Sequence, residues 1–459
     1  MQTRVKGNQQ REAARIAERP LALRIVAVSL TALFVISSLT PACRQSPTVA
    51  TVTRGPYLQM SAPSSVVIRW RTNLAVNSRV GFGLSSSSLN QAVADATPAT
   101  EHSVTLAGLQ PNTTYYYSVG SSTGDLAGDY FITPPAPGAS KPARIWVLGD
   151  AGTADANQRA VRDAYYNFNG SRHTDLWLML GDNAYSYGTD LEYQDAIFNV
   201  YPVTLRRSSL WPALGNHDTA GSSNPSPAIP YYRNFTLPQN AEAGGVASGT
   251  EDYYSFDYSN IHFVCLDSVT SSRAPGSPML TWLEADLAAN KQDWLIAYWH
   301  HPPYSKGSHD SDTGWTMIEM RSNVAPILEA HGVDLVLTGH SHSYERSYLI
   351  DGHYGPSSTF NDSMKKDGGD GRPAGSGVYR KPTLGPAARE GAVYVVAGSS
   401  GKLGGGRLNH PAMFTSLNNL GSVVLDVDGN RLDAKFIRAD GTVGDNFTII
   451  KGPDRERRD

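Results

Sequence analysis

The stretch Trp294-Leu-Ile-Ala-Tyr-Trp299-His300-His301 joins an uninterrupted apolar run to a pair of histidines. A second apolar segment, Val333 to Leu337, leads into Gly339-His340-Ser341-His342. Short apolar runs of this kind are typical of buried strands, and open α/β sheets bind ligands at the carboxyl ends of their strands. The two stretches therefore predict strands of an α/β domain that end in imidazoles, which are common metal ligands. One such histidine alone would indicate only a hydrogen-bonded core residue, so a metal site also requires carboxylates.

The composition limits the classes of function. With 459 residues the chain is long enough for two or three domains. Charged residues make up 18% of the chain and the formal net charge is -3. Nothing here predicts a polyanion-binding surface, so nucleic acid is not expected as a partner.

Residues 1–43 have the pattern of an export signal. They are basic and polar up to Arg24 and then uncharged from Ile25 to Leu39. This uncharged run is shorter than the roughly 20 residues that span a bilayer, which favours a signal peptide over a permanent helix. Cys43 directly follows a small residue, as at bacterial lipoprotein cleavage sites. Two alternatives stay open: a lipid anchor at Cys43, or full secretion to the periplasm or the exterior.

Residues 54–133 read as short β-runs separated by turns, without helical periodicity. Such spacing predicts a small all-β sandwich domain. The segment Leu109-Gln-Pro-Asn-Thr-Thr-Tyr-Tyr-Tyr117 resembles the late strands of fibronectin type III domains, whose tyrosines serve the corner and the core. The proline-rich residues 134–142 predict a stiff linker.

From 143 to 451 apolar runs alternate with amphipathic helices, which predicts an α/β layered domain. Three runs end in glycine followed by polar residues: Gly149-Asp150, Gly181-Asp182 and Gly215-Asn216-His217. Three later runs, Val393 to Ala397, Ser422 to Asp426 and Arg431 to Arg438, are predicted to complete a single sheet.

The ligand-type residues at the predicted strand exits form one set: Asp150, Asp182, Tyr185, Asn216, His300, His340 and His342. Seven donors suffice for two metal ions if one carboxylate is shared, and Asp182 is the natural bridge. Two neighbouring ions can clamp a phosphate and lower the pKa of a bound water. The set therefore predicts phosphoester hydrolysis.

The same residues, in order, resemble the five-block signature of the purple acid phosphatases, within the calcineurin-like metallophosphoesterases. The blocks are Gly149-Asp150-Ala-Gly152, Gly181-Asp182-Asn-Ala-Tyr185, Gly215-Asn216-His217-Asp218, Ala297-Tyr-Trp-His300 and Gly339-His340-Ser-His342. The resemblance implies a four-layer αββα metallophosphoesterase sandwich beside the small β-sandwich. It also implies an exported acid phosphatase that hydrolyses phosphomonoesters by attack of a metal-bound hydroxide.

Matched residue by residue to this sequence, the family pattern implies which residues bind the metals and which assist catalysis. The first metal site would be Asp150, Asp182, Tyr185 and His342, and the second would be Asp182, Asn216, His300 and His340. His217 would face the phosphate and assist the leaving group, and His309 would share the catalytic role. Asp218 stands where many members have glutamate, a change that bears on the support of a ligand.

The first block indicates the metals. Most metallophosphoesterases have a histidine two residues after the aspartate, whereas this chain has Gly152 there, and Tyr185 supplies the replacement donor. A phenolate is a hard anionic ligand, which predicts Fe(III) at the first site. The second ion would be Fe(II), Zn(II) or Mn(II).

Several alternatives remain at this stage. A phosphodiesterase or nucleotidase could use the same metals, and a surface binding protein without turnover could keep the fold. The role of His301 is open. The segment Gly398-Ser-Ser-Gly401-Lys402 has some likeness to a phosphate-binding loop but lacks the Walker spacing, so it is interpreted as a strand-exit turn.

Overall fold

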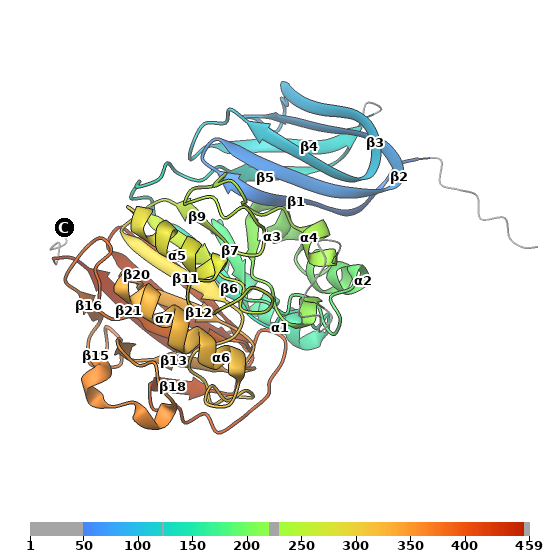
Figure 1. Cartoon of the computed structure of the whole chain (residues 1–459). Helices are drawn as coiled ribbons and strands as arrows, with labels where there is room; N and C mark the ends of the chain where they lie inside the picture. The colour runs from blue at the N-terminus through green and yellow to red at the C-terminus, as the bar shows by residue number, and fades with distance from the viewer. Residues whose placement is uncertain (1–48, 122–123, 220–228, 454–459) are drawn as a thin grey trace, which may run out of the picture. The chain divides into compact units, whose positions relative to one another are not determined.

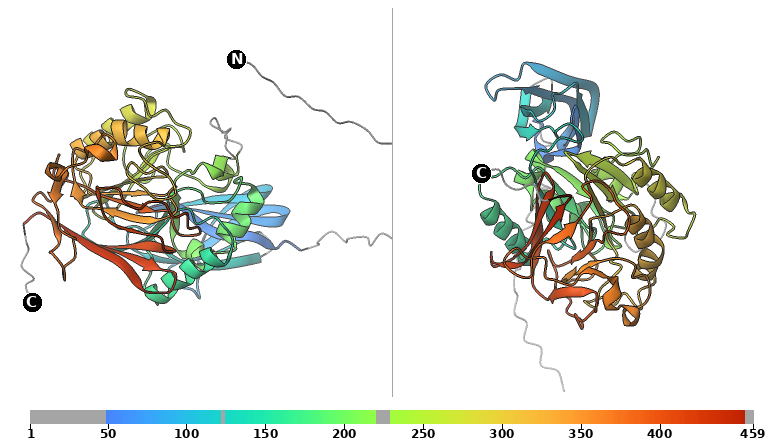
Figure 2. Two further views of the ribbon diagram at one scale, coloured as in Figure 1. Left: turned by 90° about the horizontal axis from the view of Figure 1, so that it is seen from below. Right: turned by 90° about the vertical axis from the view of Figure 1, so that its left-hand side faces the viewer.

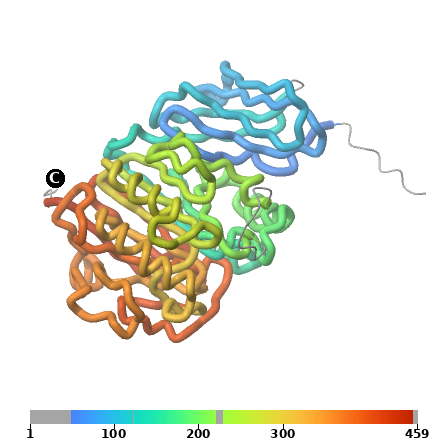
Figure 3. The backbone as a smooth tube through the Cα atoms, in the orientation of Figure 1, coloured from blue at the N-terminus to red at the C-terminus, as the bar shows by residue number. Residues whose placement is uncertain are grey.

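The computed structural model describes residues 49–121, 124–219 and 229–453. Residues 47–459 form one compact unit, whose course is drawn in Figures 1 and 3. The predicted signal peptide and Cys43 lie outside the described residues. Within the described ranges, no helix is both long and apolar enough to cross a bilayer.

The first five strands build the N-terminal β-domain. The long strand β2 pairs with β1 and β3 along its first half and with β3 and β4 along its second half. A strand that changes partners in this way lets the sheet bend around its own core, which contains Trp70, Phe82 and Tyr117. The bounds are β1 (Val52–Ala62), β2 (Ser65–Gly83), β3 (Gln91–Ala107), β4 (Thr114–Ser121) and β5 (Gly124–Ile132).

The tyrosines of β4 have the structural roles expected from the sequence. The Tyr115 hydroxyl accepts a hydrogen bond from the Gln110 backbone N–H at 3.0 Å, which closes the corner before the strand. The Tyr117 hydroxyl donates to the carbonyl of Arg206 at 2.9 Å. Both rings are buried.

The rest of the chain forms two seven-stranded mixed sheets. The first has the order β16-β21-β20-β19-β6-β7-β8, and β6, β7 and β8 run parallel to one another. Its strands are β6 (Ala143–Leu148), β7 (Leu176–Met179), β8 (Ser209–Pro212), β16 (Tyr379–Lys381), β19 (Gly421–Asp428), β20 (Arg431–Arg438) and β21 (Val443–Lys451).

The second sheet has the order β18-β13-β17-β12-β11-β10-β9, with β10, β11, β12 and β17 parallel. Its strands are β9 (Tyr254–Tyr258), β10 (Ile261–Cys265), β11 (Trp294–Trp299), β12 (Leu335–Thr338), β13 (Tyr344–Ser347), β17 (Val393–Ala397) and β18 (Met413–Leu417). The prediction that β17 shares a sheet with β19 and β20 is therefore wrong. An apolar run indicates that a strand is buried, but it does not indicate which strand lies next to it in the sheet.

The two sheets pack face to face, with helices on their outer sides. The inner layer is a continuous apolar cluster from both sheets, in which Trp211 of β8 stacks on Phe256 of β9 at 3.8 Å between ring centroids. On the outer side of the first sheet, Tyr165 of α1 stacks on Trp146 at 4.0 Å. Figure 2 (right) shows the teal helix α1 on one side of the strands and the yellow and orange helices α5, α6 and α7 on the other. The expected αββα order is confirmed.

The helical segments are mostly short. The helical run from Trp315 to Ala330 contains a central π-helical turn. The bounds are α1 (Ala156–Asn169), α2 (Asp190–Tyr193), α3 (Pro202–Arg207), α4 (Pro230–Asn234), α5 (Pro278–Ala289), α6 (Trp315–Glu319) and α7 (Ala325–Ala330). The π-helical segments are Gln194–Phe198 and Met320–Val324, the 3-10 turns are His217–Thr219, Ser357–Thr359 and Asp362–Met364, and a small hairpin pairs β14 (Leu349–Ile350) with β15 (Lys365–Asp367).

A buried charged triad joins α5 to the second sheet. His262 of β10 lies between Asp257 of β9, at 2.7 Å from Nδ1, and Asp286 of α5, at 2.8 Å from Nε2. Burial lowers the pKa of His262, but the two carboxylates outweigh burial and raise the pKa to about 9. The imidazolium is thus the form that the folded protein stabilises.

We expect His262→Leu to lower the free energy of unfolding by about 3 to 5 kcal/mol, because the buried Asp286 and the partly buried Asp257 lose their shared cation. The pKa of His262 is higher in the folded than in the unfolded protein. Its contribution to the free energy of unfolding is therefore complete below the unfolded pKa and is lost as pH rises through about 9. Urea unfolding of both proteins at about pH 6 and about pH 9.5 measures this. A deficit of equal size at both pH values would contradict it.

Candidate metal centre

Strand ends from both sheets meet at one edge of the sandwich. From the first sheet, β6, β7 and β8 lead into Asp150, Asp182 and Asn216. From the second sheet, β11 leads directly into His300, and β12 leads into His340. The sequence predicted this convergence, because the carboxyl ends of parallel strands share an edge.

Glycine permits the strand ends to approach one another. A Cβ on Gly215 would lie 1.9 Å from the backbone nitrogen of Asp182, and a Cβ on Gly339 would lie 2.5 Å from Asp150 Oδ2. No side chain fits at either position. The His340 backbone N–H donates to the same Asp150 oxygen at 2.7 Å, which ties the two sheets together at the centre.

The first group of donors surrounds Asp150. The Tyr185 hydroxyl lies 3.1 Å from Asp150 Oδ1 and 3.3 Å from His342 Nε2. His342 Nε2 is 3.5 Å from the same carboxylate oxygen. Asp150, Asp182 and His342 each offer an atom to a group whose members all lie within 4.8 Å of one another. Three elements far apart in sequence thus place oxygen and nitrogen donors around one point.

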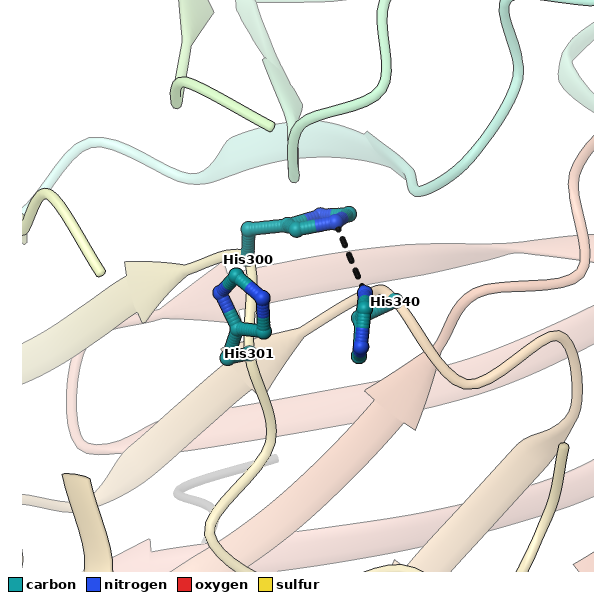
Figure 4. A group of neighbouring side chains, drawn as sticks. All are labelled: His300, His301 and His340. Carbon is teal, nitrogen blue, oxygen red and sulfur yellow. Dashed lines mark hydrogen bonds between the residues drawn. The ribbon is translucent and has the colours of Figure 1, made fainter. Parts of the chain in front are cut away.

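The second group surrounds Asn216. Its Oδ1 lies 3.0 Å from His300 Nε2 and 3.1 Å from His340 Nδ1, and these two nitrogens are 3.2 Å apart. Figure 4 shows the His300 and His340 rings joined by a dashed line between these two nitrogens, with His301 beside them.

Asp182 contacts both groups. Its Oδ1 lies 3.5 Å from His300 Nε2, in the second group, while it also belongs to the cluster of Asp150 and His342. The same oxygen accepts the His217 backbone N–H at 2.8 Å. Asp182 is buried, so its charge is held between the two groups rather than in solvent.

The second group has the chemistry of a cation site. His300 Nδ1 donates to the carbonyl of Leu180 at 2.9 Å, so in the neutral ring Nε2 carries a lone pair. That lone pair faces the Asn216 oxygen, which is itself an acceptor. Acceptors directed at one another repel unless a cation lies between them, so these residues fit a metal ion.

The surrounding charges act differently on the two imidazoles of the second group. Burial, reinforced by the neighbouring imidazoles, lowers the pKa of His340 well below its usual value, which keeps the ring neutral. Burial also lowers the pKa of His300, but Asp182 and Asp150 outweigh it and raise that pKa. Burial and the same two carboxylates raise the pKa of Tyr185 well above its usual value. A phenolate at this position therefore needs a strong positive charge opposite it.

Three further histidines line the centre. His217 is half-exposed, its Nδ1 donates to the carbonyl of Ser186 at 2.8 Å, and its Nε2 lies 3.9 Å from Asp182 Oδ2. The His309 ring is 3.9 Å from the His340 ring. The His301 ring, whose role the sequence left open, is 4.2 Å from the His340 ring, and its Nδ1 lies 2.9 Å from the Ser268 hydroxyl.

Asp218 supports the two strand exits that carry Asp182 and Asn216. It is buried and accepts four hydrogen bonds: from the Asn183 backbone and side chain at 3.0 and 2.9 Å, from the Gly215 N–H at 2.8 Å and from the Tyr193 hydroxyl at 2.6 Å. Burial and the Asp182 charge raise the pKa of Asp218 to about 7.

Sequence reasoning missed the position of Lys402. Its Nζ lies 4.1 Å from the centroid of the Tyr185 ring, a distance at which a cation and an aromatic face attract. The segment 398–402 does follow a strand, as interpreted, but that strand is β17 of the second sheet. Because β17 was assigned to the other sheet, nothing indicated that its exit reaches the metal centre.

Comparisons with known proteins agree with this geometry. The family model described as calcineurin-like phosphoesterase matches residues 143–344, and the one described as the purple acid phosphatase N-terminal domain matches residues 54–133. The chain belongs to the purple acid phosphatase family. These are binuclear metal enzymes that act as metal-dependent phosphatases on small-molecule phosphoesters. Two clusters in the described part of this chain could hold a metal, one of Asp150, Asp182 and His342 and one of His300, His301 and His340.

Among curated relatives, probable purple acid phosphatase 20 of Arabidopsis thaliana is 28% identical over 63% of this chain and 68% of its own length. Purple acid phosphatase 1 of Ipomoea batatas is 28% identical over 68% of this chain and 66% of its own length. Purple acid phosphatase 21 of Arabidopsis thaliana is 32% identical over 53% of each chain. The chain thus spans between about half and two thirds of the length of such relatives.

A solved purple acid phosphatase from yellow lupin seeds superimposes with a TM-score of 0.64, over 87% of this chain and 75% of that one. At 18% identity, this likeness supports the fold.

We expect Asp218→Ala to weaken metal retention by about 10- to 100-fold, because the loops bearing Asp182 and Asn216 lose their common acceptor. Dialysis against a graded chelator series, followed by metal analysis, measures the loss. Asp163→Ala, which removes an exposed aspartate of α1, is the matched control and should retain metal like the unmodified protein. Equal retention in the two variants would contradict a supporting role for Asp218.

Proposed function

We propose that this protein is a binuclear-metal acid phosphatase that hydrolyses phosphomonoesters. The observation that carries the proposal is the position of Asp182, which lies against both donor groups at the meeting point of the two sheets. A carboxylate so placed can bridge two ions, and a phosphate can bind across such a pair.

The proposed ligands follow the two groups. Asp150, Asp182, Tyr185 and His342 would hold the first ion, and Asp182, Asn216, His300 and His340 would hold the second. When bound, the pair supplies a hydroxide near neutral or acidic pH by lowering the pKa of a bound water, and it neutralises charge on the phosphate.

His217 is proposed to protonate the departing oxygen of the substrate. Its Nδ1 hydrogen bond to the Ser186 carbonyl fixes the ring, and its half-exposed edge is open to a ligand. The second nitrogen can then hold a proton directed at the centre, as general acid catalysis requires. His309, packed on His340, is proposed to face the same phosphate.

Fe(III) is proposed at the first group. Tyr185 lies against Asp150, and no histidine follows that aspartate in its loop. A hard trivalent ion suits a phenolate beside carboxylates. Fe(II), Zn(II) or Mn(II) is proposed at the second group, where two imidazoles and an amide oxygen converge.

Export is proposed from the sequence pattern of residues 1–43. Both forms considered there, a lipoprotein held by Cys43 and a fully secreted enzyme, fit a phosphatase that acts outside the cytoplasm. Replacement of Cys43 followed by cell fractionation distinguishes the two.

Loss of Asp182 tests the proposed function. We expect Asp182→Ala to lose both metals and at least about three orders of magnitude in kcat on phosphomonoesters, since both groups lose their shared anion. Metal analysis and a parallel assay on mono- and diesters measure this, with Asp163→Ala as control. Retention of metal and activity by Asp182→Ala would refute the mechanism, and faster diester cleavage by the unmodified enzyme would favour a phosphodiesterase.

The tyrosine tests the identity of the first metal. We expect the purified protein to be coloured, with a visible phenolate-to-Fe(III) charge-transfer band, and Tyr185→Phe to lose that band. Absorption spectra recorded with iron analysis measure this, and Tyr187→Phe is the matched control two residues away. A colourless, iron-free and active enzyme would exclude Fe(III) while leaving the phosphatase proposal intact.

A further inference from the structure

A cleft of about 460 Å³ opens beside the second donor group. His301, His309 and His340 line it on the side of the donor group, and the exposed Trp315 and the buried Met317 line it on the side of α6. This volume exceeds that of a phosphate and lies within the range of small-molecule pockets. The cleft therefore has room for more of a substrate than the group that is hydrolysed.

Trp315 differs from the other tryptophans of the chain. It is 70% exposed, whereas the other seven are buried. It is the first residue of α6, and the buried Met317 lies two residues further along the same helix. An exposed indole offers a flat apolar face, which favours stacking on another aromatic ring.

The charges in the cleft suit an anion at one end and a neutral group at the other. Asp310, the acidic residue among the lining side chains, is paired with Lys306 at 2.7 and 2.9 Å. Lys306 also pairs with Asp312 at 2.8 Å, so one ammonium offsets the negative charge of Asp310 only in part. The imidazoles lie on the side of the donor groups, and Trp315 lies toward solvent.

We propose that this cleft binds the leaving group of the substrate, and that Trp315 stacks on an aromatic ring carried by it. The preferred substrates are then phosphomonoesters of ring-bearing alcohols, whether the ring is an aryl group or a nucleobase. The proposal rests on the proposed phosphatase function and extends it to substrate class. With the phosphate at the donor groups, the cleft directs the rest of the molecule past His309 toward α6.

The test compares substrates with and without a ring, using the metal-loaded enzyme. We expect Trp315→Ala to lose about tenfold in kcat/KM for phenyl phosphate, a typical effect of removing an aromatic stacking partner. Its kcat/KM for glycerol 2-phosphate should stay within about twofold of the unmodified enzyme. Trp315→Phe should recover most of the loss, because a flat apolar face is restored. Adenosine 5′-monophosphate is assayed in parallel. Its kcat/KM shows whether stacking on Trp315 favours a nucleobase as well as a simple aryl group.

Binding is measured independently of turnover by calorimetry with phenylphosphonate and methylphosphonate. We expect Trp315→Ala to weaken the binding of phenylphosphonate and to leave the binding of methylphosphonate unchanged. An equal loss on ring-bearing and ring-free compounds, or no loss on either, would overturn the proposal. If the unmodified enzyme hydrolysed none of the phosphomonoesters, the proposed function itself would fail, which is a distinct outcome.

Discussion

The close approach of strand ends from two facing sheets is the constraint on which this protein depends. Gly215 and Gly339 occupy positions where any side chain would collide with the loops of Asp182 and Asp150. Because these positions stay empty of side chains, donors from five strands converge on one small volume. The apolar layer between the sheets holds this edge in place, since each strand that delivers a donor is fully buried.

Much of the convergence could be predicted from the sequence, for a simple physical reason. A buried strand of an α/β sheet reads as an apolar run, and a glycine after it marks a tight exit. Asp150, Asp182 and Asn216 follow such glycines, so their common edge was predictable without knowledge of the full strand order. The family resemblance implied Tyr185 as a donor, because the first loop lacks the histidine that most metallophosphoesterases have there. The ligand roles of these residues remain proposals.

Other features depend on pairing, which local pattern does not encode. The run Val393 to Ala397 is as apolar as its neighbours, and only the folded chain places it next to β12. Lys402 went unrecognised for the same reason. The packing of His301 and His309 on His340 depends on ring orientation at the end of β11 and in the loop beyond it, which residue spacing does not define.

The backbone at the centre has a further consequence. Asp150, Asp182 and His340 all have positive φ angles, of 56°, 52° and 64°, a conformation that glycine adopts freely and other residues adopt at a cost. Glycine would avoid this cost, but at Asp150 and Asp182 it would also remove the carboxylates that accept the backbone N–H groups of His340 and His217. Three of the proposed metal ligands thus have backbone conformations with an intrinsic cost, which the packing of the two sheets around them must offset.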